Sequence, residues 1–559
     1  MSVSIIGCVI LSALFSLVSL IIPPLRESLG GFLLAAGYTA VFAVLSLRFR
    51  ASPGRARLAA YRKALEYLPF VLFASFVMSR SAGAEPSYAI DVVSAVLWVA
   101  IVATAFVIQY RLSDKRIMRS YPGLDAAVDK PKSAVRHALE WVDALVQAAC
   151  LVLIINLFFF QLYAIPSESM VPEFMIGDRV VVVKTPSGPK FPLTEVGIPR
   201  MRGYERGDIV VFSNPHYNDT REARVTSFAS QLVYMLSFTA ININRDEFGR
   251  VKADPLVKRV TGVPGEKLMM VDGVLYAKRA GDAGFSPVAE DATWATWDVA
   301  SLPRSELALV KHVPLTKDAF AELASIESRR ANLDLDAARR EAEAIVRRFA
   351  ALKRSADTVV SAPELFPRAR FEIVSLFQSS DEVSRVLLTT NGGYLWFRDF
   401  MTSWAASPNR ANLFDERSER LNVMLKLAFG RLVVRNAELL TSNVTAGEFA
   451  SDETRNGLLA EAEAYRYYLS WNDQRNMGEF PKGEGNYIPE GCFFMMGDNR
   501  FNSLDMRHSY ETTLAPVDPD DAYSFLYRSN IDPQYVPVNR ILGAASFRFW
   551  PPSRLGVTE

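Results

Sequence analysis

The chain has 559 residues, too many for one ordinary domain, and its length suggests two or three. Its 62 Lys and Arg residues nearly balance 61 Asp and Glu residues, so charge gives no reason to expect a nucleic acid or an acidic partner. The three cysteines, Cys8, Cys150 and Cys492, show no metal-binding spacing, and two of them lie in apolar runs, which argues against a structural disulfide. Half of the residues are hydrophobic, and most of that excess falls within the first 165.

Five apolar segments precede residue 165 and predict a membrane module of about five helices. A helix needs about 20 residues to cross about 30 Å of hydrocarbon. The first, fourth and fifth segments are long enough, and the second is slightly short. The third is interrupted by Ser79 and Arg80, so a short buried or re-entrant helix is an alternative there. The segments are approximately Val3–Ile22, Gly31–Leu47, Tyr67–Met78, Tyr88–Val107 and Ala144–Ala164.

The charges of the connecting loops predict the orientation of this module. The loop at residues 48–63 holds six Arg and Lys, and the loop at 111–136 holds seven, whereas the two other loops hold one each. Because basic loops stay in the cytoplasm, this alternation predicts a cytoplasmic amino terminus and places everything after Ile165 outside. The first segment lacks a basic leading region, so we expect it to remain as an anchor rather than to be cleaved.

Short β patterns follow the fifth segment. The stretches "DRVVVVK", "GDIVVFSNP" and "KLMMVDGVLYAKR" are rich in β-branched residues, and Asp272-Gly273 stands at a hairpin position. Three further stretches lie among these strands in the order "PSESM" (166–170), "LVKRVTGVPGEK" (256–267) and "GCFFMMGDNRFNSLDMR" (491–507).

These three stretches, in this order behind a membrane helix, resemble bacterial signal peptidase I, a Ser–Lys serine endopeptidase family. The stretches "RGDIVVF" (206–212) and "ILGAASFRFWPPSRLG" (541–556) match further blocks of that family, and together the motifs cover about a third of the chain. We therefore expect a multi-domain membrane protein, in which an N-terminal α-helical transmembrane bundle precedes a mainly-β signal-peptidase catalytic domain with a large helical insertion.

The resemblance assigns roles to two pairs of residues. Ser169 matches the nucleophile and Lys258 the general base. A serine needs such a base, and burial among apolar neighbours can lower the pKa of a lysine far enough for it to serve. Ser167 matches the residue whose hydroxyl helps to form the oxyanion hole, and Ser503 matches the residue that orients the lysine amine.

Four charged residues match the ion pairs that support such a site: Arg259, Asp498, Asp505 and Arg507. Strand alternation places Lys258 and Arg259 on opposite faces. The chain also departs from the family pattern at four positions: Glu168 stands where a glycine is common, Glu173 where a threonine often follows the proline, Phe501 where an acidic residue is usual, and Met506 where the family has a serine. No metal-binding motif is present, and we expect no metal and no cofactor.

The family resemblance lapses between about residues 279 and 489. There the stretch "LDLDAARREAEAIVRRFAALKR" repeats apolar residues at steps of three and four, which predicts an amphipathic helix. A helical cap on the β domain and a partner-binding arm are alternatives for this insertion. A second insert, Arg221–Arg250, could be core or a surface that rests on the bilayer. We thus expect a membrane module (1–165), two parts of a catalytic domain (166–278 and 490–559) and the insertion (279–489).

The sequence therefore predicts a membrane-bound signal peptidase I that cleaves signal peptides from exported preproteins after small residues. The resemblance implies a bacterial inner-membrane location with the catalytic domain on the periplasmic face. It also implies preproteins, the lipid bilayer and the secretion translocon as partners, and no nucleic acid. Two alternatives remain open at this point: a Ser–Lys peptidase with narrower substrates, and a non-catalytic membrane scaffold that binds envelope or translocon partners through the insertion.

Overall fold

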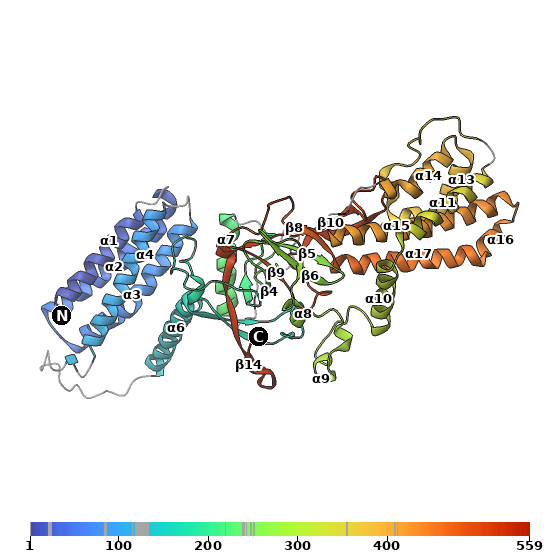
Figure 1. Ribbon diagram of the computed structural model, residues 1–559. Coiled ribbons are helices and arrows are strands. Elements are labelled where there is room, and N and C mark those ends of the chain that lie inside the picture. Colours follow the sequence, from blue (N-terminus) through green and yellow to red (C-terminus); the bar gives the residue numbers. More distant parts are fainter. Residues whose placement is uncertain are drawn as a thin grey trace.

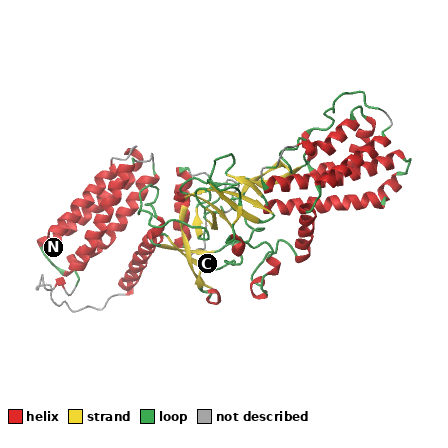
Figure 2. Ribbon diagram, in the orientation of Figure 1, coloured by secondary structure: helices red, strands yellow, loops and turns green. Residues whose placement is uncertain are grey.

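The computed structural model of the chain describes residues 2–20, 25–82, 87–113, 116–117, 134–217, 220–237, 241, 243–245, 249, 252–353, 356–406, 410 and 412–558. Three parts follow one another along the molecule. A helical bundle at the amino-terminal end is followed by a β domain, and a second group of helices lies at the far end (Figure 1). The strands are confined to the middle of the molecule (Figure 2).

Four helices form the amino-terminal bundle, and a fifth leads from it into the β domain. The bundle helices are α1 (Ser2–Leu20), α2 (Leu25–Ala51), α3 (Arg55–Ser81) and α4 (Tyr88–Arg111), and the fifth helix is α6 (Ala134–Phe158). Within the described part of the chain, four helical stretches are long and apolar enough to cross a membrane: Val3–Leu20, Leu29–Ala51, Tyr88–Arg111 and His137–Phe158.

Helix α3 contains the third apolar segment. It is one continuous helix of 27 residues rather than a short one, but Glu66 and Arg80 lower its hydropathy, and it is not among the four stretches. The helix continues through Arg80 because this buried guanidinium meets Asp91 of α4 at 3.0 Å and donates to Ser94. A buried charge in such a bundle needs a partner of this kind.

The central domain is built on antiparallel strands. The largest sheet has the order β1-β2-β13-β3-β4-β9-β12, with β14 paired to β13. A four-stranded sheet has the order β7-β6-β5-β8, and β10 pairs with β11. The strands are β1 (Phe160–Ala164), β2 (Arg179–Val183), β3 (Ile209–Phe212), β4 (Leu256–Gly262), β5 (Glu266–Val271), β6 (Val274–Arg279), β7 (Ser286–Pro287), β8 (Met477–Phe480), β9 (Cys492–Met496), β10 (His508–Pro516), β11 (Leu526–Ile531), β12 (Val536–Pro537), β13 (Ile541–Trp550) and β14 (Gly556–Val557).

The hairpin between β5 and β6 is the one predicted from the sequence. Val271 pairs with Val274, and the two residues between them, Asp272 and Gly273, both have positive φ angles, 51° and 85°. A two-residue turn with positive φ at both positions matches the twist of the strands, which explains the Asp-Gly sequence. This prediction is confirmed.

Between β7 and β8 the chain forms the helical region, which we define as residues 288–476. Its long central helix α15 packs against α10, α11, α13, α14 and α17. The predicted amphipathic stripe lies on α11, where Ala338, Ala342, Ile345 and Phe349 are buried in the core of this region. The helices are α8 (Asp291–Trp294), α9 (Arg304–Leu307), α10 (Lys317–Ala331), α11 (Leu335–Leu352), α12 (Ile373–Gln378), α13 (Ser380–Thr389), α14 (Gly393–Thr402), α15 (Leu413–Thr441), α16 (Ala446–Ser451) and α17 (Glu453–Asn472).

The second insert contains one helix, α7 (Arg221–Leu236), and part of it lies outside the described residues. Most of the described side chains on α7 are half-buried. The Arg221 guanidinium donates to the backbone oxygen of Arg80, so α7 touches the end of α3. This helix therefore contacts the end of the amino-terminal bundle from the β domain.

Candidate active site

Strand β4 carries the predicted base into contact with the predicted nucleophile. Lys258 Nζ donates a hydrogen bond of 2.5 Å to Ser169 Oγ. Lys258 lies opposite Val210 in the pairing of β4 with β3 and is 3% exposed. Ser169 lies in the turn after β1, and only ten residues, 159–168, separate it from the end of α6. Two stretches that are 89 residues apart in the sequence thus meet at a single hydrogen bond.

Burial lowers the pKa of Lys258 from 10.5 to about 8, because the ammonium loses its hydration. The carboxylates of Asp505 and Asp498 oppose this shift by attraction at longer range. A substantial fraction of the amine is therefore neutral near pH 8. In that form it accepts a proton from a hydroxyl at hydrogen-bonding distance.

Arg259, the next residue on β4, forms a buried ion pair instead of contacting Ser169. Arg259 binds Asp498 with two hydrogen bonds, of 2.9 and 2.8 Å, and both side chains are buried. Its guanidinium also lies over the ring of Trp294, 4.8 Å from the centroid. Lys258 and Arg259 therefore point to different partners, as strand alternation predicts.

The loop after β9 holds the backbone of the predicted nucleophile. The amide of Asn499 donates to the carbonyl oxygen of Ser169 at 3.2 Å, and its side chain donates to that of Glu168 at 3.0 Å. A Cβ on Gly497 would overlap both the Ser169 carbonyl oxygen and the hydroxyl of Ser503. Only glycine lets the loop approach this closely.

A buried ion pair fixes the shape of the same loop. Asp505 accepts two hydrogen bonds from Arg507, at 2.8 and 2.9 Å, and one from the amide of Gly497. Burial alone would raise the pKa of Asp505, but the Arg507 guanidinium outweighs it and holds that pKa well below the usual range. Arg507 also donates to the backbone oxygen of Arg500, which closes the loop on itself.

The two remaining predicted residues lie beside the dyad. Ser167 is exposed, and its Oγ lies 3.4 Å from Ser169 Oγ. Ser503 is 5% exposed, and within the described residues its Oγ has no hydrogen-bond partner. The expected hydrogen bond between Ser503 and the Lys258 amine is therefore not formed in this structure.

A family model described as "Signal peptidase, peptidase S26" matches residues 138–292 and 433–550, which include every one of these site residues. The chain is therefore similar to the signal peptidases of this family over two segments that together make up slightly less than half of its length. The matched segments leave α1–α4 and residues 293–432 uncovered.

Three relatives are named signal peptidase I, and all come from Buchnera aphidicola. The one from the subspecies Schizaphis graminum is 44% identical over 68 residues, which are 12% of this chain and 22% of the relative. Those from Acyrthosiphon pisum and Baizongia pistaciae are 30% and 32% identical over 117 and 118 residues, 21% of this chain in both cases. The chain spans between 22% and 27% of the length of these signal peptidases.

Sequence reasoning missed the partner of Glu168. This residue is 5% exposed, and its carboxylate accepts the backbone N–H groups of Lys311 and His312, the latter at 3.1 Å. The side chain of Asn502 also donates to it, at 3.4 Å. The departure from the signal peptidase pattern at this position was visible, but its partner lies 143 residues away in the chain.

Phe501, another departure from the family pattern, also contacts the helical region. Phe501 packs edge-on against Trp297, Phe320 and Trp471, with centroids 5.0 to 6.4 Å apart. It therefore belongs to the core that the helical region shares with the loop after β9. In the part of the chain that the structure describes, no group of three His, Cys, Asp or Glu residues is arranged to hold a metal ion.

Proposed function

We propose that the chain is a membrane-bound signal peptidase I, a serine endopeptidase that uses a Ser169–Lys258 dyad to cleave signal peptides from exported preproteins after small residues. The observation that carries the proposal is the 2.5 Å hydrogen bond from a fully buried lysine to a serine hydroxyl. A lysine whose pKa is lowered to about 8 is a competent base near neutral pH. Similarity to the S26 signal peptidases over the segments that carry both residues supports the same chemistry.

In this mechanism Ser169 Oγ attacks the scissile carbonyl carbon while Lys258 Nζ takes the hydroxyl proton. The tetrahedral intermediate collapses, the C–N bond breaks, and the ammonium of Lys258 returns the proton to the leaving amine. A water molecule, deprotonated by the same amine, then hydrolyses the acyl-enzyme ester and frees Ser169. This is the Ser–Lys version of acid–base assisted acyl transfer.

The neighbouring hydroxyls complete the proposed site. Ser167, exposed beside Ser169, would donate to the oxyanion together with the Ser169 amide. Ser503, whose buried hydroxyl has no partner among the described residues, is available to orient the Lys258 amine. Arg259 with Asp498, and Asp505 with Arg507, would hold β4 and the loop after β9 without touching the substrate.

We extend the proposal to the organisation of the chain. The membrane module ends with α6, short of the expected residue 165, because β1 (Phe160–Ala164) pairs with β2 in the sheet of the catalytic domain. The catalytic domain comprises 166–278 and 490–559 together with β1, β7 and β8, since β7 and β8 pair with β6 and β5. The insertion is therefore the helical region (288–476), which is shorter than the expected 279–489. The amino terminus lies in the cytoplasm and the catalytic domain on the periplasmic face of the bacterial inner membrane. The short connection from α6 to Ser169 supports this placement, because it keeps the nucleophile near the membrane surface, where a signal peptide emerges. Preproteins are then the substrates, and the secretion translocon is a further partner.

Cleavage of a panel of purified preproteins by the full-length protein in detergent tests the proposal. Ser169→Ala should abolish cleavage, and Ser167→Ala should lower kcat/KM by about 10²–10³ because one oxyanion donor remains. Ser470→Ala, an exposed serine on α17, is the matched control and should cleave like the wild type. Retained cleavage in Ser169→Ala would refute the dyad. Cleavage of few preproteins would favour a narrower peptidase, and cleavage of none by the wild type would favour a scaffold.

A further inference from the structure

A cavity of about 330 Å³ lies between α7 and one end of the β domain, beside the end of α6 and away from the Ser169–Lys258 contact. Its walls come from α7, from the segment 187–195, and from the ends of β2, β3, β4 and β13. Five cationic side chains line it, against two carboxylates, so the cavity carries an excess of positive charge. The cations are Lys184, Lys190, Arg224, Lys252 and Arg540, and the carboxylates are Glu195 and Asp254.

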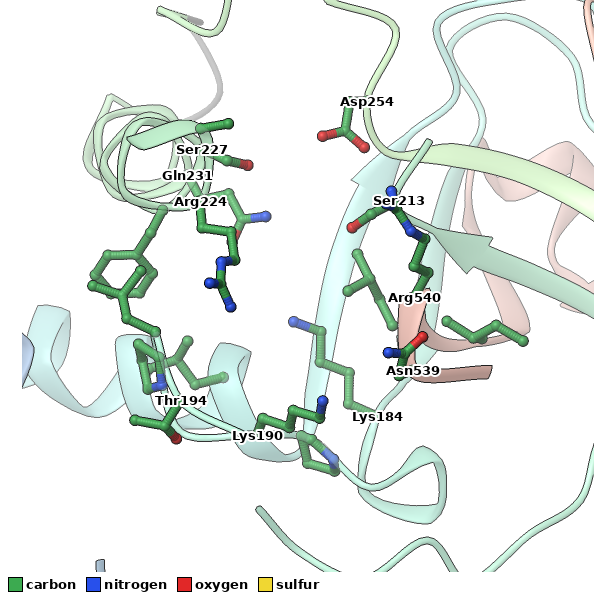
Figure 3. A pocket seen from close by; sticks show the side chains of 18 of the residues that line it. Lys184, Lys190, Thr194, Ser213, Arg224, Ser227, Gln231, Asp254, Asn539 and Arg540 are labelled. Carbon is green, nitrogen blue, oxygen red and sulfur yellow. The ribbon is translucent and has the colours of Figure 1, made fainter. Parts of the chain in front are cut away.

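The cations converge from different elements. Figure 3 shows Arg224 reaching down from α7 and Lys184 reaching up from the end of β2, with Lys190 below them and Arg540 on the opposite wall. Lys184 is 8% exposed, and its amine donates to the backbone oxygen of Asn156 at 2.9 Å. Burial lowers the pKa of Lys184 to about 8, so an anion in the cavity would stabilise its charged form.

Glu195 already interacts with two of the cations that line the cavity. Its carboxylate pairs with Lys190, and it lies 3.7 Å from Arg224. Its side chain is 61% exposed, so it is held at the mouth of the cavity and can turn away to solvent. An incoming anion would compete with Glu195 for the same two cations.

One wall of the cavity packs against the apolar helices, and the end of α6 lines the cavity. Phe191, in the wall segment, packs among Phe76 of α3, Trp98 of α4 and Phe158 of α6, with centroids 5.8, 5.7 and 4.9 Å away. Leu157 of α6 lines the cavity itself. Because only 6% of the apolar stretch of α6 is buried within the protein, that helix offers a surface along which acyl chains can lie.

We propose that this cavity binds the phosphate of an anionic membrane phospholipid, whose acyl chains lie along α6. A phosphate diester matches a cluster of lysine and arginine side chains at the end of membrane helices, and basic pockets between such helices are used for lipid head groups. The proposal requires the helices to lie in a bilayer but does not depend on the proposed peptidase activity.

Binding of a fluorescent phosphatidylglycerol to the full-length protein in a neutral detergent tests this site. Lys190→Gln/Arg224→Gln should weaken binding roughly 10- to 30-fold, the loss expected for two cations near a membrane surface. Glu195→Gln should strengthen it, because the competing carboxylate is gone. Arg385→Gln/Lys482→Gln removes two exposed cations that do not line the cavity and should leave binding unchanged.

Three results would overturn the proposal. The first is an equal loss of binding in the cavity variant and in the control, which would mean that the lipid is held by charge elsewhere, such as the basic loops. The second is weaker or unchanged binding in Glu195→Gln. The third is displacement of the lipid by inorganic phosphate as effectively as by unlabelled phosphatidylglycerol, which would make the cavity a site for a free oxyanion rather than for a lipid.

Discussion

The charge state of Lys258 controls the proposed mechanism, and pH is its most direct perturbation. The base is the neutral amine, which exists above its pKa and disappears as pH falls through it. Because burial lowers that pKa from 10.5 to about 8, kcat/KM should lose about tenfold per pH unit below about pH 8. At pH 8 the shift raises the neutral fraction from about 0.3% to about 50%, a gain of about 150-fold over an ordinary lysine.

The same shift has a consequence for stability. The folded state holds the Lys258 proton less tightly than the unfolded chain does, so the unfolded state binds more protons between pH 8 and 10.5. Stability therefore rises with pH across this window, and below it the buried ammonium costs about 3 kcal/mol. Lys258→Met removes that cost while filling a similar volume. It should abolish cleavage at every pH and raise the free energy of unfolding of the β domain at pH 7 by up to about 3 kcal/mol.

Two measurements check this reasoning: kcat/KM for a preprotein from pH 5 to 10, and the urea midpoint of the β domain in detergent. Lys267→Met is the matched control, since Lys267 is also a buried lysine but has a carboxylate partner, Glu479, at 3.2 Å. That variant should keep the acidic limb of the wild type. A flat profile between pH 5 and 8, or cleavage by Lys258→Met, would show that the base is another group. A Lys258→Met variant less stable than the wild type would refute the desolvation argument.

Three further predictions follow from the contacts around the site. Glu168→Ala removes the buried carboxylate that accepts the N–H groups of Lys311 and His312, so we expect a loss of about 1–3 kcal/mol in stability, as for hydrogen bonds to a charged group, and faster tryptic cleavage after Lys311. Gly497→Ala pushes a Cβ against Ser169, and a misplacement of about 1 Å should lower kcat/KM about 10²-fold. In cells that express a protein without native cysteines, a single cysteine at Arg57 should be shielded from an impermeant maleimide, whereas one at Asp336 should react.

The first two of these predictions have matched control variants. Glu322→Ala removes an exposed carboxylate of the helical region and should change neither stability nor tryptic cleavage. Gly284→Ala places a Cβ where no atom lies within 4 Å, so it should keep full activity. Unchanged tryptic cleavage in Glu168→Ala, full activity in Gly497→Ala, or labelling at Arg57 with protection at Asp336 would contradict the corresponding prediction.

The sequence was most informative where local pattern decides local structure. Asp272-Gly273 marked a hairpin, because turn geometry depends on those two residues. Apolar runs marked α1, α2, α4 and α6, but the fifth run was expected to be helical up to Ala164, and this was wrong. Helix α6 ends at Phe158, and Phe160–Ala164 is strand β1, because it pairs with β2. The contact of Ser169 with Lys258 came from motif order, which carries long-range information that periodicity does not. Without that resemblance, nothing in the composition would have paired two residues 89 positions apart.

The sequence was least informative about partners across the fold. Arg80 looked like the interruption of a helix, yet the helix continues because Asp91 of α4 pairs with it. The hydroxyl of Ser503 was expected on the Lys258 amine and has no partner among the described residues. Both outcomes depend on tertiary packing, which neither propensity nor hydropathy encodes.

Two of the four departures from the signal peptidase pattern lie where the helical region docks. Glu168 holds the backbone of residues 311 and 312, and Phe501 fills an aromatic cluster with Trp297, Phe320 and Trp471. Glycine at 168 would leave those N–H groups without an acceptor, and a carboxylate at 501 would be buried among rings. Without the helical region, in turn, the carboxylate next to Ser169 would lack its donors, and Phe501 would be exposed beside Ser503. We therefore infer that Glu168 and Phe501 changed together with the insertion of the helical region, most of which the family model leaves unmatched. The helical region supports the geometry of the nucleophile and is not an independent arm of the catalytic domain.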